Sequence, residues 1–343
     1  MEREIIELAE KIRKDSAPEG VVLSMGDDCA VLAPSAGMEI AVTTDTLEEG
    51  IHFSHDYFSP CSLGIKTAAV NLSDMAAMGA VPRWAFLNLS LDRNHMNLKW
   101  TSGFMRGLSS MLAAHGTHLA GGDTVAAAFG LSVTMTIIGE VEPGMALSRG
   151  GASPGDTVFC SGFTGEAGGG LVMLRHPETG AGMGRIAARR LRDRHLHPVP
   201  QVAAGRTLAE NCLASSATDI SDGIATDLAN ICRMSGVSAV IHADSLPLSG
   251  SLRRFCRRAA PEVAYQYTGI SDLPLELSFM LSAGEDFELL WTVPPEREKE
   301  SVARVAETLG RAPFRIGEIR QGTGVFLEYG GREIDISRRG YEH

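Results

Sequence analysis

Residues 62–79 read S-L-G-I-K-T-A-A-V-N-L-S-D-M-A-A-M-G, an apolar stretch that carries one carboxylate, Asp74, in its interior. The Ala, Leu and Met residues predict a helix, and Gly79 predicts where it ends. Asp is a poor residue for a helix interior, and an unpaired buried carboxylate is costly. Asn71 lies three residues earlier and shares a helix face with Asp74. This polar stripe needs either a cation or a buried hydrogen-bond network as its partner, and we favour a functional role.

Four further acidic motifs contain Gly, Ser or Thr and are expected where strands end or helices begin. They are Gly26-Asp27-Asp28, Thr43-Thr44-Asp45, Gly121-Gly122-Asp123 and Asp219-Ile220-Ser221-Asp222-Gly223, and Gly284-Glu285-Asp286 repeats the pattern. Each motif alone is compatible with a turn or a helix cap. Caps and turns, however, do not require acids at so many loop ends. Hard oxygen ligands suit Mg²⁺, which usually binds together with substrate phosphates, so the set predicts metal-dependent phosphate chemistry.

The bulk composition narrows the class of protein. The 343 residues favour two domains, and a net charge of -11 argues against nucleic acid as the main partner. The sequence contains no apolar run of about 20 residues that would span a membrane. Residues 1–14 show an amphipathic pattern with Glu and Lys, unlike a signal peptide, so we expect a cytoplasmic protein. The six cysteines lack C-x-x-C spacing and are expected to be reduced.

Strands and helices alternate irregularly, which favours an α+β fold. In the first half we expect helices at 62–78 and 98–115, with strands at 30–32, 40–44, 84–91, 117–120 and 131–141. The turn-rich segment 148–156 predicts a domain boundary, giving domains 1–147 and 148–343. In the second half we expect helices at 200–213 and 223–235, with strands at 157–160, 288–293 and 325–329. The sequence contains no P-loop and no set of protein-kinase motifs.

The order of the motifs resembles that of the thiamine-monophosphate kinases, in the superfamily of aminoimidazole ribonucleotide synthetase. The matching motifs are G-D-D-C-A, T-T-D-T-L, N-L-S-D-M-A-A-M-G-A, G-G-D-T, L-S-R-G-G-A-S-P-G-D, D-I-S-D-G and A-G-E-D-F-E-L. They run from Gly26 to about Gly317, with a fainter tail at Gly340-Tyr341. The resemblance implies a two-domain α+β fold whose N-terminal α/β domain forms a homodimer through its strands and whose C-terminal α/β domain completes the cleft. It also implies ATP, several Mg²⁺ ions and phosphorylation of thiamine monophosphate.

The resemblance assigns roles to individual residues. The implied metal ligands are Asp28, Thr43, Thr44, Asp45, Asp74, Asp123, Asp219 and Asp222. The implied ATP contacts are Gly122, Asp123, Arg149 and Ser221, and the substrate-side positions are His52, Glu285 and Arg338. Of these residues, Asp45, Asp123, Asp222 and Arg149 are the expected catalytic set. The acceptor is already a phosphate oxyanion near neutral pH, because its second pKa is about 6, so no general base is required.

One position departs from the family pattern. Arg338 stands where the family typically places an aromatic residue to stack on thiamine. A guanidinium can stack on a ring, but it repels a cationic thiazolium. Three interpretations follow: another aromatic residue substitutes, the substrate binds more weakly, or the acceptor differs. The alternative functions are a selenophosphate synthetase, a hydrogenase maturation enzyme or an idle nucleotide-binding paralogue. The first two are disfavoured because no Cys precedes Gly26 and residues 340–343 contain none.

Overall fold

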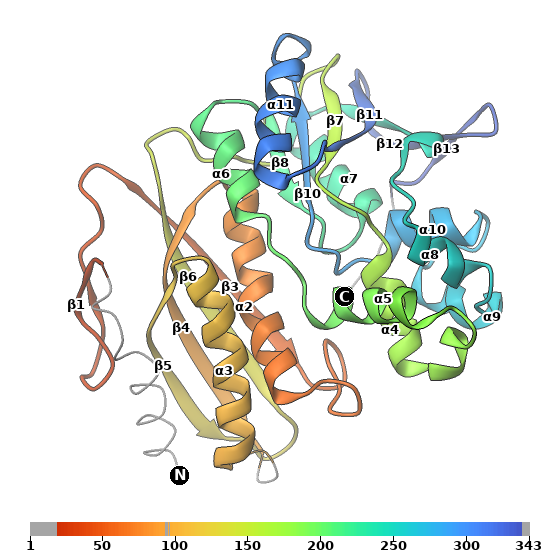
Figure 1. Ribbon diagram of the computed structural model, residues 1–343. Helices are drawn as coiled ribbons and strands as arrows, with labels where there is room; N and C mark the ends of the chain where they lie inside the picture. Colours follow the sequence, from red (N-terminus) through yellow and green to blue (C-terminus); the bar gives the residue numbers. More distant parts are fainter. Residues whose placement is uncertain (1–18, 93–94, 96, 338–343) are drawn as a thin grey trace. The chain divides into compact units, whose positions relative to one another are not determined.

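The computed structural model describes residues 19–92, 95 and 97–337, and the chain divides into two compact units. Unit 1 comprises Met1–Met75 and Ala80–Gly144, and unit 2 comprises Ala76–Gly79 and Met145–His343. Each unit combines helices with its own sheet, which gives the expected two-domain α+β fold (Figure 1).

Unit 1 is built on a four-stranded sheet of order β3-β6-β4-β5. Strands β4 and β5 are parallel, and the other neighbours are antiparallel. In β6, Val133, Met135 and Ile137 are buried while the residues between them are partly exposed, so one face of the sheet is covered. The bounds are β3 Glu39–Glu48, β4 Val81–Leu91, β5 His118–Ala126 and β6 Ser132–Val141, with a separate hairpin of β1 Val21–Leu23 and β2 Val31–Leu32.

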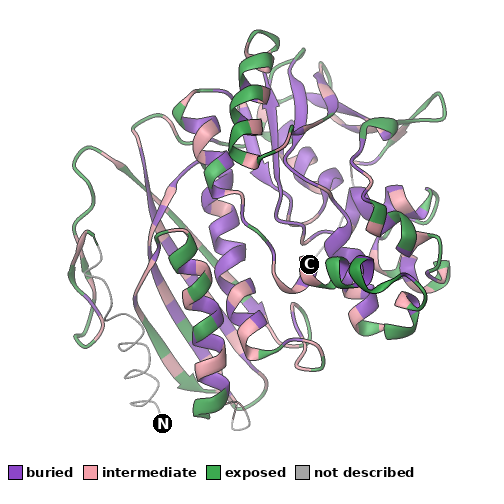
Figure 2. Cartoon of the chain, in the orientation of Figure 1, coloured by how far each residue is buried: buried purple, intermediate pink, exposed green. Residues whose placement is uncertain are grey.

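Helices α2 (Pro60–Ala77) and α3 (Leu98–Ala114) pack side by side against this sheet. Figure 2 shows α2 buried along most of its length and α3 exposed on one side. The two helices approach closely because Gly64 faces the Phe104 carbonyl, and Gly107 faces the backbone of Cys61. The expected helices at 62–78 and 98–115 are therefore present, with slightly different ends.

Two expected strand ends were wrong. Thr43-Thr44-Asp45 lies inside β3, because this strand pairs with β6 as far as Glu48. Gly121-Gly122-Asp123 lies inside β5, because the pairing with β4 continues past a register shift between Ala85 and Phe86. Both acidic motifs are thus held by sheet hydrogen bonds and not by loop ends.

Unit 2 contains a seven-stranded sheet of order β13-β12-β9-β11-β7-β10-β8, in which only β12 and β9 are parallel neighbours. The strands are β7 Thr157–Cys160, β8 Ser216–Asp219, β9 Ser238–His242, β10 Leu289–Val293, β11 Phe314–Arg320, β12 Gly324–Tyr329 and β13 Arg332–Asp335. The α-helices are α4 Glu166–Arg175, α5 Arg185–Leu196, α6 Val202–Glu210, α7 Ile224–Ser235, α8 Gly250–Cys256, α9 Pro261–Ala264, α10 Leu275–Ser282 and α11 Glu298–Leu309. Of these elements, the sequence predicts β7, β10, β12, α6 and α7, and β8 was not predicted.

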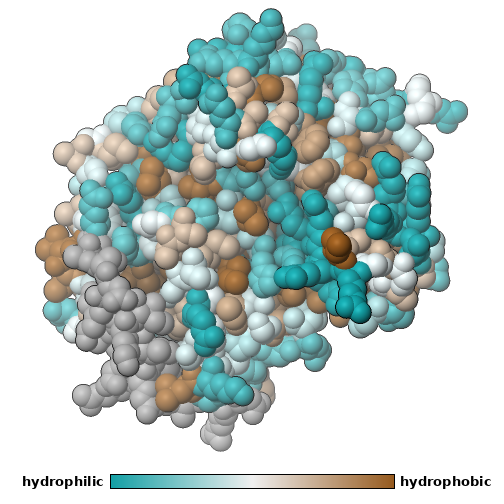
Figure 3. Space-filling model, in the orientation of Figure 1, coloured by the Kyte–Doolittle hydropathy of each residue, from teal (hydrophilic) through white to brown (hydrophobic). Residues whose placement is uncertain are grey.

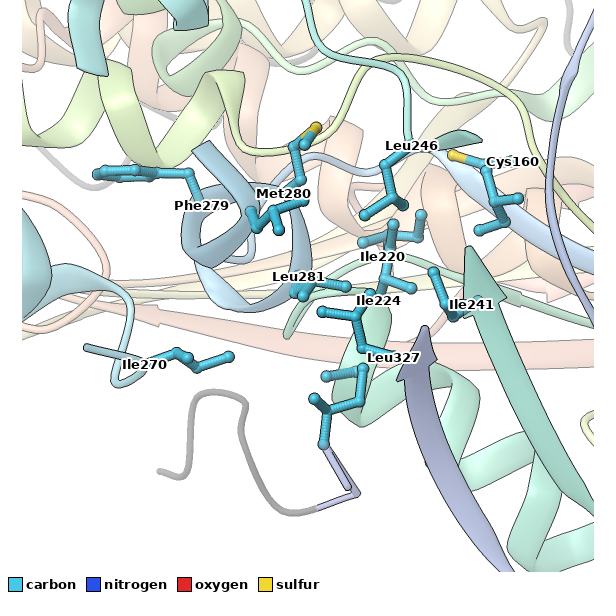
Figure 4. Close-up of a cluster of buried hydrophobic side chains, with 14 of the residues drawn as sticks. Cys160, Ile220, Ile224, Ile241, Leu246, Ile270, Phe279, Met280, Leu281 and Leu327 are labelled. Carbon is cyan, nitrogen blue, oxygen red and sulfur yellow. The ribbon is translucent and has the colours of Figure 1, made fainter. Parts of the chain in front are cut away.

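The core of unit 2 lies between its sheet and helices such as α7 and α10. Ile224, Leu228 and Ile231 recur at helical spacing along α7 and are buried. In Figure 4, Ile220, Ile224 and Leu281 point into one apolar cluster. This packing fixes both ends of the segment that contains the D-I-S-D-G motif.

Among the described residues, no helix is long and apolar enough to cross a membrane. All six cysteines are free.

Candidate active site

In unit 1, two carboxylates meet between β3 and α2. Thr43 and Asp45 are two residues apart on β3 and therefore project from the same face of the sheet. On α2, Asp74 accepts a hydrogen bond from the Thr43 Oγ1 hydroxyl. Burial, and then the nearby charge of Asp74, raise the pKa of Asp45 to about 6. A bound cation would relieve this repulsion, so this part of the donor set fits a divalent metal.

The Thr44 hydroxyl lies on the opposite face of the sheet. Its Oγ1 accepts a hydrogen bond of 3.0 Å from Thr136 Oγ1 on β6. Because alternate strand residues face opposite ways, this hydroxyl does not join Thr43 and Asp45.

Asp28 and Asp123 are both exposed in unit 1. The Asp28 N–H donates to Asp27 Oδ1 at 3.2 Å, and Asp123 Oδ1 accepts from the Thr124 N–H at 2.8 Å. Both bonds join adjacent residues and do not by themselves point to a ligand, so a role in binding metal or nucleotide stays a prediction for both residues.

Gly122 is required by the sheet itself. Its φ is 151°, and a Cβ there would lie 1.9 Å from the Leu87 carbonyl oxygen of β4. The glycine thus permits close strand pairing, whether or not a nucleotide also approaches it.

His52 follows β3 in a tight turn. Its Nδ1 accepts a hydrogen bond of 3.0 Å from the Glu48 N–H. In the neutral ring the proton therefore sits on Nε2, which leaves that nitrogen as a donor. The substrate-side role of His52 stays a prediction.

In unit 2, sheet register brings three loops to one end of neighbouring strands. Strand β10 pairs antiparallel with both β7 and β8, matching Leu290 to Cys160 and Leu289 to Asp219. The segments after β7, after β8 and before β10 therefore emerge together. They contain Ser161-Gly162, the D-I-S-D-G motif and the G-E-D-F-E sequence.

The D-I-S-D-G turn is held by Asp227, which the sequence analysis missed. One Asp227 oxygen accepts N–H bonds of 3.1 Å from both Asp222 and Gly223. Burial, followed by the charges of Asp219 and Asp222, raises its pKa well above the usual range, and Arg149 opposes this shift. Arg149 is anchored by a 3.2 Å bond from its Nε to Thr218 Oγ1. The structure thus brings Arg149 close to three neighbouring acids, Asp219, Asp222 and Asp227, which lie far from it in the sequence.

The position of Asp227 in the sequence could have identified it. It lies on the face of α7 that contains Ile224, Leu228 and Ile231, as Asp74 lies on an apolar helix face. A carboxylate on an apolar helix face therefore marks Asp227 in the sequence just as it marks Asp74.

A second set of buried charges surrounds the start of α4. Glu166 is fully buried and accepts bonds of 2.7 and 3.0 Å from Arg190 of α5. Arg194 pairs with buried Glu288 and lies 3.6 Å from Glu166. Glu285 lies 3.1 Å from Nδ1 of buried His195. Figure 3 shows hydrophilic side chains gathered over the outer side of α5, so these arginines link a polar surface to buried acids.

Within residues 19–92, 95 and 97–337, no group of three or more His, Cys, Asp or Glu side chains is spaced to hold a metal ion. Among the predicted ligands, Thr43, Asp45 and Asp74 lie together in unit 1, and Asp219 and Asp222 lie together in unit 2. Arg338 and Gly340-Tyr341 lie outside the described residues.

Comparison with known proteins identifies the family. Residues 26–141 match the N-terminal domain of AIR synthase related proteins, and residues 153–330 match the C-terminal domain. The thiamine-monophosphate kinase of Escherichia coli K12 is 37% identical over 94% of this chain and 92% of its own. That of Bacillus subtilis is 32% identical over 94% of each chain.

Solved structures agree with the sequence relatives. The thiamine-monophosphate kinase of Stenotrophomonas maltophilia K279a is 34% identical, has a TM-score of 0.79, and covers 95% of each chain. A structure described as AaThiL complexed with AMPPCP and TMP is 28% identical, has a TM-score of 0.72, and covers 97% of this chain and 94% of its own. The chain belongs to the thiamine-monophosphate kinase family, within the AIR synthase related proteins.

Proposed function

We propose that this protein transfers the γ-phosphoryl group of ATP to thiamine monophosphate, giving thiamine diphosphate and ADP. The observation that carries the proposal is 37% identity to a thiamine-monophosphate kinase over 94% of this chain, together with a solved relative complexed with AMPPCP and TMP. The acidic motifs of both units are consistent with it.

The main barrier to this reaction is electrostatic. Each pair of like charges about 4 Å apart is repelled by roughly 4 kcal/mol at an effective dielectric constant near 20. The acceptor phosphate is itself the nucleophile, so this chain has to position two polyanions and needs no catalytic base. The exposed, anchored guanidinium of Arg149 is suited to contact the oxygens of the transferring group.

Mg²⁺ is the metal that this donor set favours. In unit 1, Thr43, Asp45 and Asp74 would hold such an ion together with phosphate oxygens, and Asp28 and Asp123 are further candidates. In unit 2, Asp219 and Asp222 would do the same for another ion. When bound, Mg²⁺ supplies positive charge that offsets repulsion between the phosphates. We also propose that the protein works as a homodimer formed through the outer face of the four-stranded sheet.

A coupled assay of ADP release tests the function. We expect ADP release to require thiamine monophosphate, to be absent with thiamine, and to stop when EDTA removes the metal. ADP release that thiamine monophosphate does not stimulate would reject the proposal. Calorimetric binding of ATP in that case would identify an idle nucleotide-binding protein.

A further inference from the structure

The turn at residues 284–287 has an unusual backbone. Gly284, Glu285 and Phe287 have φ values of 69°, 58° and 51°, in the left-handed region. Residues other than glycine rarely adopt it, and a bulky Phe there is an outlier. Such conformations persist only where surrounding contacts enforce them, and they gather at functional sites.

Backbone hydrogen bonds connect this turn to the D-I-S-D-G motif. The Glu285 N–H donates to the Ser221 carbonyl at 2.6 Å, and the Phe287 N–H donates to the Ile220 carbonyl at 2.9 Å. The Ile220 N–H returns a bond of 2.8 Å to the Glu288 carbonyl. Two of the left-handed residues, Glu285 and Phe287, thus donate their N–H groups to the D-I-S-D-G motif.

The side chain between them, Asp286, reaches a different element. Its two oxygens accept separate N–H bonds, 2.6 Å from Gly165 and 3.1 Å from Ala167, at the start of α4. Gly165 is the N-cap of this helix and has no side chain to cap it, so Asp286 supplies the missing acceptor. A Cβ on Gly165 would lie 2.7 Å from the Phe279 carbonyl carbon, so this helix start is packed tightly.

Asp286 is buried, with 3% exposure, in a region crowded with charge. Burial raises its pKa to about 7, while the two N–H groups and Arg194 favour the ionised form. Glu288, two residues on, pairs with Arg194, which also approaches Glu166 in the first turn of α4. The helix start is therefore held to residues 286–288 by both hydrogen bonds and ion pairs.

We propose that Asp286 is a positioning residue that fixes the Ser221-Asp222 turn relative to the start of α4, and thereby sets nucleotide affinity. This inference rests on the proposed function, with Asp222 as a metal ligand and Ser221 as the ATP contact that the family resemblance implies. When the two hydrogen bonds that Asp286 accepts from Gly165 and Ala167 are lost, the strained turn at residues 284–287 is free to relax. The Ser221 carbonyl, bonded to Glu285, then loses its fixed place.

The test compares Asp286→Ala and Asp286→Asn with Ser249→Ala. Ser249 is a matched control because its Oγ caps α8 of the same unit, accepting the Leu252 N–H at 3.1 Å. We would measure calorimetric affinity for AMPPCP with Mg²⁺, the KM for ATP, kcat, and the melting temperature. The amide introduced by Asp286→Asn would keep one acceptor oxygen and place an NH₂ against the other N–H, so this variant probes these two hydrogen bonds specifically.

We expect Asp286→Ala to weaken AMPPCP binding and raise the KM for ATP by about tenfold or more, and Asp286→Asn to do so by about threefold. Ser249→Ala should lower the melting temperature but keep affinity within about twofold of the wild type. Wild-type affinity in Asp286→Ala, or equal loss in Ser249→Ala, overturns the inference. If Asp286→Ala does not fold, wild-type affinity in Asp286→Asn overturns it. Binding of AMPPCP is measured without thiamine monophosphate, so it tests Asp286 even if wild-type turnover refutes the proposed function.

Discussion

At the scale of single residues, the acidic side chains of this protein differ in their burial and in the charged groups that lie near them. Asp45 shares a half-buried position with Asp74, and Asp222 lies in a turn whose N–H groups are held by Asp227. A carboxylate placed beside others in this way is suited to bind a cation. Asp193 on α5, by contrast, is partly exposed and forms an ion pair with Arg189.

We therefore expect Asp45→Asn and Asp222→Asn each to lower kcat by more than about tenfold while the fold stays intact. Steady-state kinetics and circular dichroism would measure the two effects. Asp193→Asn is the control and should retain wild-type kcat. Normal activity in both active-site variants would remove the metal assignment.

The buried carboxyls also predict how stability depends on pH. The pKa of Asp286 is raised to about 7, so between about pH 4 and 7 the native protein keeps a proton that the unfolded chain has lost. The free energy of unfolding therefore falls as pH rises through this range. Asp45, with its pKa raised to about 6, and Asp227 act in the same direction.

Urea unfolding of the metal-free protein would measure this dependence. We expect the wild type to be less stable at pH 8 than at pH 6, with Asp286 contributing about 1 kcal/mol of the difference. Asp286→Asn should reduce the difference, although it lowers stability at both pH values through the lost hydrogen bond. Asp193→Asn should leave it unchanged. An equal pH dependence in Asp286→Asn and the wild type would contradict the raised pKa.

At the scale of elements, the two helices of unit 1 were easier to predict from the sequence than the ends of its strands, whereas in unit 2 only α6 and α7 were predicted among the helices. The helix at Pro60–Ala77 could be predicted because the apolar residues that define it lie close together in the sequence. The continuation of β3 to Glu48 was not, since it depends on pairing with β6, almost 90 residues later. The same limit hid β9 and β11, whose burial is decided by partners distant in sequence.

Close helix packing leads to a prediction at this scale. A Cβ on Gly64 of α2 would lie 2.1 Å from the Phe104 carbonyl oxygen of α3, so Gly64→Ala must push the helices apart. We expect a loss of about 1–3 kcal/mol in the free energy of unfolding, measured by urea denaturation. Gly250→Ala in α8 is the control, because a Cβ there meets nothing within 4 Å. It should be neutral or stabilise by up to about 1 kcal/mol, and similar losses in both variants would refute the packing argument.

At the scale of the whole molecule, the chemistry of the acids was readable from the sequence, but the contacts that support them were not. Asp74, Asp219 and Asp222 stood out because acids beside apolar or glycine-rich sequence are unusual. Asp286 also stood out as part of the Gly284-Glu285-Asp286 motif. The contacts of Asp286 and Glu288 were not readable, because their partners Gly165 and Arg194 are about a hundred residues away. Resemblance to a family transfers motifs, whereas the contacts that hold a motif in place have to be seen in three dimensions.

The outer face of the unit 1 sheet carries the last prediction. Ile40 and Val42 of β3 are 46% and 63% exposed, and Val125 of β5 is 49% exposed. These residues lie on the two edge strands of the sheet. Exposed apolar residues on an open sheet face favour association, and a two-fold symmetric dimer would cover the same face in both copies. Val42→Glu should place unpaired charge inside that contact.

We expect the wild type to elute as a dimer in size-exclusion chromatography with light scattering, and Val42→Glu to elute as a monomer. Ile186→Glu is the control, because Ile186 is 88% exposed on α5, which belongs to unit 2 and not to the sheet of unit 1. It should remain dimeric. A dimer that survives Val42→Glu, or that Ile186→Glu also dissociates, would place the contact elsewhere, since a buried, unpaired carboxylate destabilises any interface that contains it.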